Sequence, residues 1–169
     1  MKQLIGAHLK EFLITLVLII ALAFLIELVP EPETLSAEFV FSPVVLLLGI
    51  TALSLPFFAS IPAGYLISKK RAELKDAIAV PAAAGVVAAL LIVGFSVVQL
   101  MLTSDAEIAE QLQKMEEFGM GFFASMTPEQ YRSFAITSSL FGFVLVAVIN
   151  FALGILGGLA GRFIALRRI

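Results

Sequence analysis

Side chains that could carry chemistry are scarce in this sequence. It contains no cysteine, which excludes disulfides, thiolate zinc sites, iron–sulfur clusters and thiol nucleophiles. Its single histidine, His8, has no second histidine to partner it, so the sequence supports neither a histidine metal site nor histidine acid–base catalysis. We therefore expect no catalytic residue, no cofactor and no metal ion.

Asn150 is the polar residue that lies deepest in an apolar stretch. Serines in such stretches have no histidine or lysine nearby to activate them as nucleophiles. Glu27 lies near the end of its stretch, so the ionisable group that a proton-coupled pump needs at mid-depth is missing. We predict that Asn150 makes a hydrogen bond between helices, worth about 1 kcal/mol. The alternative is a polar pathway that it shares with Ser96 or Gln99.

The composition is that of a membrane protein. Of the 169 residues, 60% are hydrophobic and 14% are charged. Soluble domains are about half apolar and about a quarter charged. The polar residues are too few to cover a water-soluble particle of this size, so we expect one membrane domain over residues 1–169.

Four apolar runs are long enough to cross a bilayer, which takes about 20 residues as a helix. The fold class predicted is an all-α membrane protein whose transmembrane helices span residues 12–29, 43–67, 77–102 and 134–161. Pro30 ends the first run, and Ser42-Pro43 begins the second as an N-cap and first turn. A cleaved signal peptide is the alternative for the first run. Its 18 apolar residues exceed the roughly 7–15 of a signal, which favours a retained span.

The distribution of basic residues predicts the orientation. Nine of the eleven lie on one side of the predicted spans: Lys2, Lys10, Lys69, Lys70, Arg71, Lys75, Arg162, Arg167 and Arg168. Basic residues in short loops mark the cytoplasmic side. We therefore expect a multi-pass protein of the plasma membrane with both termini in the cytoplasm.

Residues 103–133 form the one sizeable segment outside the predicted spans. Ser104 and Glu107 have the spacing of a capping box, which predicts a short amphipathic helix on the outer side. Thr127-Pro128-Glu129-Gln130 is a second helix start, about one turn before the fourth span. The segment is interpreted as lying along the outer interface or over the helix ends. The alternative is a lid or a docking site for a partner.

Two local matches indicate a duplicated hairpin. Leu9-Lys10-Glu11 enters the first span as Leu74-Lys75-Asp76 enters the third, and residues 63–71 leave the second span as residues 160–168 leave the fourth. A parallel repeat would explain both matches. Convergence is the alternative, since helices that end on the cytoplasmic side share a small, aromatic and basic ending.

Small residues mark the faces where membrane helices pack closely. Two overlapping G-x-x-x-G pairs occur in the fourth span, and small residues lie at the same depth in the second and third. The predicted packing residues are Gly154, Gly157, Gly158, Gly161, Ala84, Gly85, Ala88, Ala63 and Gly64, with Asn150 on the same stripe. The first span, rich in leucine and isoleucine, is expected to be peripheral.

Pro56 and Pro62 lie inside the second span. Each removes a helix hydrogen bond, so a kink is predicted there, with Ser60 among the side chains that can bond the backbone. A broken helix lining a transport site is the alternative interpretation.

The residues from Gly154 to Arg168, a glycine-rich helix ending in arginine, resemble the last helix of small four-span membrane proteins of archaea and bacteria. The resemblance covers about a third of the chain and implies no activity. Tetraspanins and claudins share the topology, but their outer loops depend on cysteines. Small multidrug exporters carry a glutamate within the first helix, where this chain has only Glu27 near the exit.

Two function classes remain. The first is a non-enzymatic membrane subunit that forms oligomers or supports another membrane protein, and it is the class that we predict. Its partners would be the lipid bilayer and either further copies of the chain or another membrane protein, with no nucleic acid. The alternative is a small oligomeric transporter or channel, for which the sequence offers few polar residues at mid-depth.

Overall fold

The computed structural model describes residues 2–27, 43–70, 72–117 and 120–167, and every element in these residues is a helix. The helices are α1 (Lys2–Ala7), α2 (Leu9–Glu27), α4 (Pro43–Lys69), α5 (Leu74–Leu102), α6 (Asp105–Glu117), α7 (Gly121–Ala124) and α8 (Pro128–Arg167). The predicted end of the first span at residues 28–29, its stop at Pro30 and the basic residues Arg71 and Arg168 lie outside the described residues.

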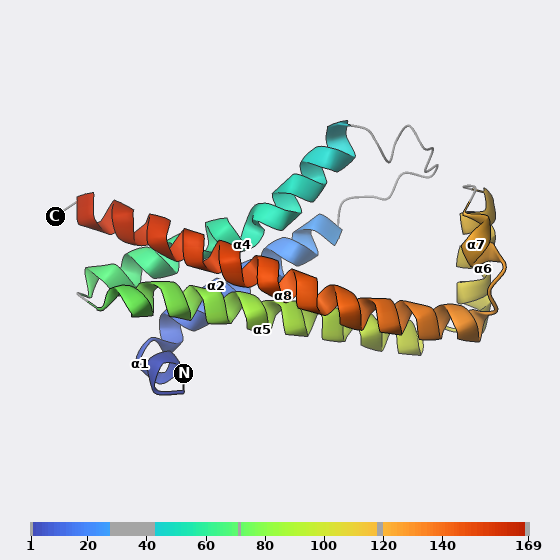
Figure 1. The fold of residues 1–169 in the computed structure, drawn as a ribbon, viewed down its shortest axis with the longest axis horizontal. Coiled ribbons are helices and arrows are strands. Elements are labelled where there is room, and N and C mark those ends of the chain that lie inside the picture. Colours follow the sequence, from blue (N-terminus) through green and yellow to red (C-terminus); the bar gives the residue numbers. More distant parts are fainter. Residues whose placement is uncertain (1, 28–42, 71, 118–119, 168–169) are drawn as a thin grey trace.

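The molecule is an elongated bundle (Figure 1). The N-terminal end and the C-terminal end lie at one end of it, and α6 and α7 lie at the other. Helix α8 packs against α4 and α5, while α2 packs against the same two helices but not to a comparable extent against α8. The arrangement therefore has α4 and α5 in the middle, with α8 and α2 on either side of them.

Helices α5 and α8 are long and apolar enough to cross a membrane, each with a stretch of mean hydropathy 2.5. With 40 residues, α8 is about 60 Å long, because an α-helix rises about 1.5 Å per residue. It begins at Pro128, six residues before the predicted fourth span, and continues past Gly161 to Arg167. Its ends therefore extend beyond a hydrocarbon core of about 30 Å.

Both predicted helix starts in the segment 103–133 are present. The Ser104 backbone N–H donates to Oε2 of Glu107 at 2.8 Å, and the Glu107 N–H donates back to Oγ of Ser104 at 3.3 Å. At the start of α8, Thr127 and Gln130 exchange the same pair of bonds at 2.9 and 3.3 Å. These reciprocal bonds satisfy backbone N–H groups that a helix start would otherwise leave unpaired. The short helix α7, which the sequence analysis did not predict, lies between them.

Helix α4 is continuous from Pro43 to Lys69 in spite of its two internal prolines, and it changes direction along its length (Figure 1). Pro56 and Pro62 account for the bend, since each lacks an N–H and crowds the preceding turn. Oγ of Ser60 donates to the Pro56 carbonyl at 2.6 Å, one turn earlier. The serine therefore bonds a carbonyl next to the bend, although not one of the two that the prolines leave free.

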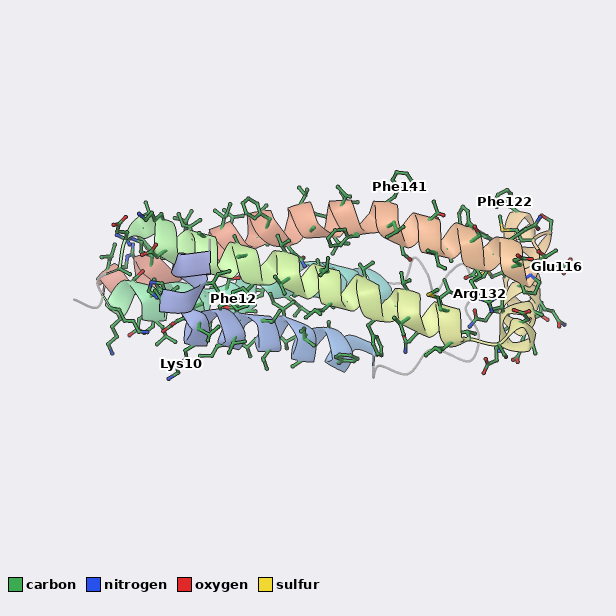
Figure 2. All side chains as sticks on the ribbon, turned by 90° about the horizontal axis from the view of Figure 1, so that it is seen from below. Lys10, Phe12, Glu116, Phe122, Arg132 and Phe141 are labelled. Carbon is green, nitrogen blue, oxygen red and sulfur yellow. The ribbon has the colours of Figure 1, made fainter. Side chains whose placement is uncertain are left out.

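Two halves of the α5–α8 hairpin differ in burial. We call residues 74–89 with 150–167 the basal half, and residues 90–102 with 128–149 the distal half. All of the buried residues of α5 and α8 lie in the basal half. Large apolar side chains are exposed in the distal half, among them Phe141, which is 77% exposed and points away from the bundle (Figure 2). Figure 2 also shows side-chain nitrogen and oxygen atoms gathered at the two ends of the bundle.

Candidate functional site

The glycines of α8 divide between two neighbouring helices. A Cβ added at Gly154 would lie 2.7 Å from Cα of Ala82, and one added at Gly158 would collide with the Ala77 carbonyl oxygen, both in α5. A Cβ at Gly157 or Gly161 would instead collide with backbone carbonyls of α4, those of Phe57 and Ile61. The Cβ positions of each G-x-x-x-G pair thus point at one neighbouring helix. Because these positions carry no side chain, α8 can approach α4 and α5 at backbone contact distance.

Two further predicted glycines lie on the opposite side of the same contacts. A Cβ at Gly64 in α4 would be 2.8 Å from Cα of Gly158, and one at Gly85 in α5 would be 2.8 Å from the Asn150 carbonyl oxygen. Because backbone atoms cannot retreat as a flexible side chain does, these sites exclude any larger residue. We call this set of contacts the glycine seam: Gly64, Gly85, Gly154, Gly157, Gly158 and Gly161.

Asn150 lies in the glycine seam and is buried. Its Nδ2 donates to the Gly85 carbonyl oxygen at 3.2 Å, from α8 to α5. The absence of a side chain at Gly85 leaves that carbonyl accessible to a neighbouring helix. The amide therefore forms a bridge between α8 and α5 at this point.

Ala84 and Ala88, two of the predicted packing residues of α5, are buried against two neighbouring helices. Ala84 packs in a cluster with Phe12 of α2 and Ile67 of α4, and Ala88 packs with Ile19 of α2 and Ala59 of α4. They therefore contact α4, and also α2, which the sequence analysis did not assign to them. Helix α2 is peripheral on one face, where Val17 is 61% exposed, but its other face is buried against α4 and α5. Ala63 of α4 is fully buried.

A charged cluster that the sequence analysis did not identify lies at the basal end. Glu11, in the first turn of α2, is 2% exposed, and its Oε1 is 2.5 Å from Nζ of Lys70 at the end of α4. Burial alone would raise the pKa of Glu11, but the hydrogen bond from Lys70, its own backbone and the charges of Lys70 and His8 together lower it below 4.5. The pKa of the Glu11 carboxylate is therefore lowered in spite of its burial.

His8 lies between two acids in this cluster. Its Nδ1 is 4.0 Å from Oε2 of Glu11, and its Nε2 is 3.7 Å from Oδ2 of Asp76 in the first turn of α5. A signal for the cluster was present in the sequence, because Glu11 and Asp76 are the acids of the two matching segments that enter the first and third spans. His8, set aside in the sequence analysis for lack of a second histidine, lies beside these two carboxylates.

Two arginines of α8 bond backbone carbonyls at opposite ends of the bundle. Arg162 donates to the Ala72 carbonyl at 3.3 Å, before the start of α5. Arg132 donates to the Thr103 carbonyl at 2.8 Å and lies 2.8 Å from the Asp105 carboxylate, where α5 ends and α6 begins. Both arginines attach α8 to an end of α5. Unpaired carbonyls at a helix C-terminus are favourable partners for a cation.

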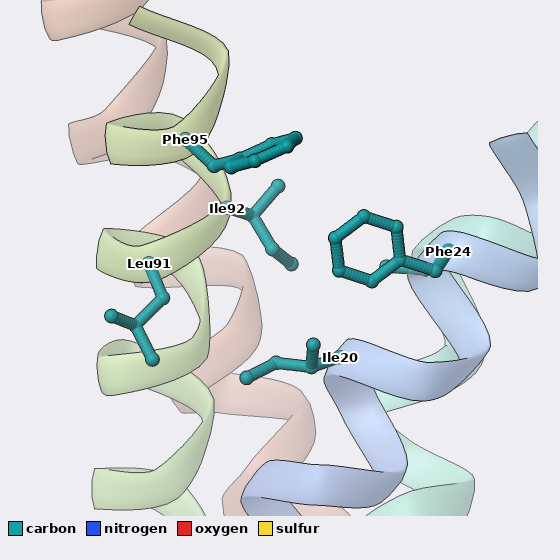
Figure 3. A pocket seen from close by; sticks show the side chains of 6 residues that line it. Ile20, Phe24, Leu91, Ile92 and Phe95 are labelled. Carbon is teal, nitrogen blue, oxygen red and sulfur yellow. The ribbon is translucent and has the colours of Figure 1, made fainter. Parts of the chain in front are cut away.

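An apolar pocket of about 250 Å³ lies between α2 and α5 (Figure 3). Its lining residues are Ile20, Ala23, Phe24, Leu91, Ile92 and Phe95. The Phe24 and Phe95 rings meet edge to face with centroids 5.7 Å apart. None of these side chains can donate or accept a hydrogen bond, so the pocket adds no polar binding site.

The described residues contain no group of three or more acidic or histidine side chains placed to hold a metal ion. Their buried polar groups at mid-bundle instead bond the backbone, as Thr15 bonds the Glu11 carbonyl at 3.0 Å. Comparison with protein families, curated proteins and solved structures finds no match to this chain.

Proposed function

We propose that this chain is a non-enzymatic integral membrane protein that crosses the bilayer four times, through α2, α4, α5 and α8. Its role is that of a packing subunit, which forms oligomers or supports another membrane protein in the plasma membrane. The observation that carries the proposal is the close-packed glycine seam at the centre of a bundle whose outer surface is apolar.

The exposed side chains support the membrane environment. On the distal half of α8, Leu140, Phe141, Val144, Leu145 and Val148 are each at least 59% exposed. Burying apolar surface is worth about 25 cal/mol per Å², so an uncovered stripe of this kind is unfavourable in water. Lipid chains or the apolar helices of a partner would cover it.

The positions of the charges support the orientation. Lys69 and Lys70 at the end of α4, Lys75 at the start of α5 and Arg167 at the end of α8 lie at the basal end, together with the N-terminus. The acidic helix α6 lies at the distal end. By the positive-inside rule, the basal end faces the cytoplasm and α6 lies outside.

The hydrogen bonds within the bundle favour a packing subunit over a transporter. Asn150 bonds Gly85 across the seam, while Ser60 and Thr15 each bond a carbonyl one turn earlier in their own helices. Close contact between backbones leaves no room for water beside Asn150. A hydrophilic path would need polar groups that face a space, and these face the backbone.

The alternative is a small transporter or channel formed by several copies. It is favoured by four exposed polar residues in the distal half, which a second copy could bring together: Ser96, Gln99, Thr137 and Ser138. In that case the path would lie between copies, away from the glycine seam.

Cysteine labelling tests the proposed orientation, and flux measurements test whether the chain is a packing subunit or a transporter. The chain has no cysteine, so single cysteines can be introduced without background labelling. We expect a cysteine at the exposed Ser125 to react with an impermeant maleimide from outside intact cells, and one at the exposed Glu73 to react only after lysis. Labelling of both positions from outside would contradict the orientation.

In liposomes, wild type and Asn150→Leu should show the same ion and small-solute flux as empty vesicles. A wild-type flux that Asn150→Leu abolishes without loss of folding would instead establish a path through the seam. A wild-type flux that only substitutions at Ser96 or Thr137 abolish would support the path between copies.

A further inference from the structure

The turn between α1 and α2 places a histidine where both of its ring nitrogens face acids. His8 follows Ala7, the last residue of α1, and the imidazole is only 11% exposed. Nδ1 faces Oε2 of Glu11 at 4.0 Å, and Nε2 faces Oδ2 of Asp76 at 3.7 Å. The two acids come from different helices, so the imidazole lies between the start of α2 and the start of α5.

The protonation chemistry of imidazole decides which form fits this geometry. A neutral imidazole carries one N–H and one lone pair, so it can donate to only one of the two carboxylates. Its other nitrogen would then present a lone pair to a carboxylate oxygen, and two acceptors would face each other. The imidazolium has an N–H on both nitrogens and can donate to both acids. The arrangement is therefore complementary to the protonated form.

The other charged groups near the imidazole are paired with one another or directed elsewhere. Lys70, which follows α4, is paired with Oε1 of Glu11. Asp76 lies within 4 Å of His8 and of no other basic side chain among the ion pairs of the described residues. The nearby Glu73 and Lys75 bond each other and are both 70% exposed. Arg162 of α8 is directed at the Ala72 carbonyl, and the described side chains of α1, Ile5–Ala7, carry no charge.

Among the described residues, four buried side-chain polar atoms have no hydrogen-bond partner, and three of them belong to this cluster: Nδ1 of His8, Oε2 of Glu11 and Oδ1 of Asp76, the fourth being Oγ of Ser68 in α4. Three of the four atoms are oxygens that can accept a hydrogen bond, and Glu11 is 2% exposed. Buried polar atoms are normally paired, because an unpaired one costs about 1–3 kcal/mol. A proton on Nδ1 of His8 would supply the hydrogen-bond donor that Oε2 of Glu11 lacks.

We propose that His8 is a proton-binding switch, and that its protonation holds the α1–α2 turn against the start of α5. Hydrogen bonds between charged groups are about 2.7–2.9 Å long, so the protonated ring would draw Glu11 and Asp76 closer by about 1 Å. Loss of the proton removes one donor and leaves Asp76 without a cation, which frees α1 from the bundle. Histidine side chains in general change charge between pH about 5 and about 8, which is the range over which the proposal is tested. The proposal concerns the fold at the basal end and does not depend on the number of spans.

The first test uses the chain's single histidine, which makes imidazole signals unambiguous. Full-length protein with ¹⁵N-labelled histidine is examined by NMR in detergent micelles at pH about 5.5 and about 8. At the lower pH we expect two slowly exchanging imidazole N–H protons with the chemical shifts of a hydrogen-bonded imidazolium. At the higher pH we expect one imidazole N–H proton. Rapid exchange of both protons with water at the lower pH would overturn the proposal.

The second test measures release of the turn by hydrogen exchange at the backbone amides of residues 5–12, corrected for the intrinsic effect of pH. In the wild type, protection should be about tenfold greater at pH about 5.5 than at pH about 8, as expected for charged hydrogen bonds. The near-isosteric Asp76→Asn should reduce this ratio to below about twofold, since one charged acceptor is lost.

Glu73→Gln is the matched control, because it changes the net charge by the same amount three residues away without facing His8. It should keep the wild-type ratio. A wild-type ratio near one, or an Asp76→Asn variant that keeps the tenfold ratio, would refute the switch. Helix content measured by circular dichroism verifies that each variant is folded.

Discussion

The basal and distal halves of the α5–α8 hairpin are built from different residues on the same two helices. Glycine and alanine predominate in the basal half, where α8 meets backbone atoms of α4 and α5 directly. Leucine, phenylalanine and valine predominate in the distal half, where the described residues 90–102 and 128–149 include no buried one. On α5 and α8 most buried residues are therefore glycine or alanine, while most of the large apolar side chains lie on the outside.

This pattern is the reverse of a water-soluble bundle, in which large apolar residues form the core. In lipid there is no hydrophobic gain from bringing two leucines together, so helices associate where small residues allow close contact and hydrogen bonds. The comparison indicates that the stability of the isolated chain resides in the basal half. The distal half contributes exposed apolar surface, which our proposal assigns to contact with lipid or a partner.

The largest effect is expected from a bulky residue in the glycine seam. Gly158→Leu places a side chain against the Ala77 carbonyl, and neither backbone can move without separating α8 from α5. We expect a loss of about 3 kcal/mol or more in the free energy of unfolding, at the upper end of overpacking effects. Thermal unfolding in detergent micelles measures it.

Gly142→Leu is the matched control in the distal half of the same helix. A Cβ at Gly142 has no atom within 4 Å, so the leucine should cost less than about 0.5 kcal/mol. Equal losses for the two variants would remove the difference between the halves. The comparison uses the same residue change on the same helix, so helix propensity cancels.

The next effect concerns the buried ion pair at the basal end. Lys70→Met leaves the Glu11 carboxylate buried without its cation, and should cost about 1–3 kcal/mol at pH about 7. Lys69→Met is the control, since Lys69 is exposed and one residue away. A loss for Lys69→Met as large as that for Lys70→Met would show that general charge, and not the pair, matters.

The pH dependence of this pair has a defined sign. The folded-state pKa of Glu11 is lowered below 4.5, so the stability it contributes is present above that value and is lost as the pH falls through the lowered pKa. The difference in the free energy of unfolding between wild type and Lys70→Met should therefore be largest near neutrality and should disappear as the pH falls below 4.5. A difference that widens under acid conditions would contradict the assignment.

Local signals in the sequence were sufficient for several of these features. The two capping boxes depend on residues three positions apart, and the helix starts at Asp105 and Pro128 follow from them. The glycines of α8 could be selected because their spacing alone places them on adjacent stripes. The division of these stripes between α4 and α5 could not be predicted, since it depends on the directions from which the two helices approach.

Long-range contacts account for what the sequence analysis missed. Glu11 is separated by about sixty residues of chain from both Lys70 and Asp76, and the turn at His8 brings the imidazole between the two acids. Ala84 and Ala88 were placed with the seam because small residues signal close contact without naming the partner. In the structure they pack against Ile67 and Ala59 of α4 and also against Phe12 and Ile19 of α2, which the sequence did not indicate.

A smaller effect is expected from the amide in the seam. Asn150→Leu removes the hydrogen bond to the Gly85 carbonyl and should lower the free energy of unfolding by about 1 kcal/mol. Ser96→Ala in the distal half removes only a bond to its own helix, to the Ile92 carbonyl, and should cost less than about 0.5 kcal/mol. Unfolding of both variants in the same detergent gives the comparison.

The smallest global effect is expected at the far end of the distal half, at Arg132. Its guanidinium bonds the Thr103 carbonyl and the Asp105 carboxylate, so it connects α8 to the point where α5 ends and α6 begins. Both partners are near the surface, and exposed ion pairs are worth about 0–1 kcal/mol. Arg132→Gln should therefore change global unfolding by less than about 0.5 kcal/mol while loosening α6 locally.

Hydrogen exchange separates the local effect from the global one. We expect the amides of residues 105–112 to exchange about fivefold faster in Arg132→Gln, because α6 loses the contact that holds its first turn to α8. Amides of the basal half, around Gly154, should be unaffected. Glu129→Gln is the control, an exposed charge one turn earlier in α8, and should change neither region. If Arg132→Gln instead accelerated exchange in the basal half as well, the two halves would unfold as one unit, and their contrast in residue size would not correspond to a contrast in stability.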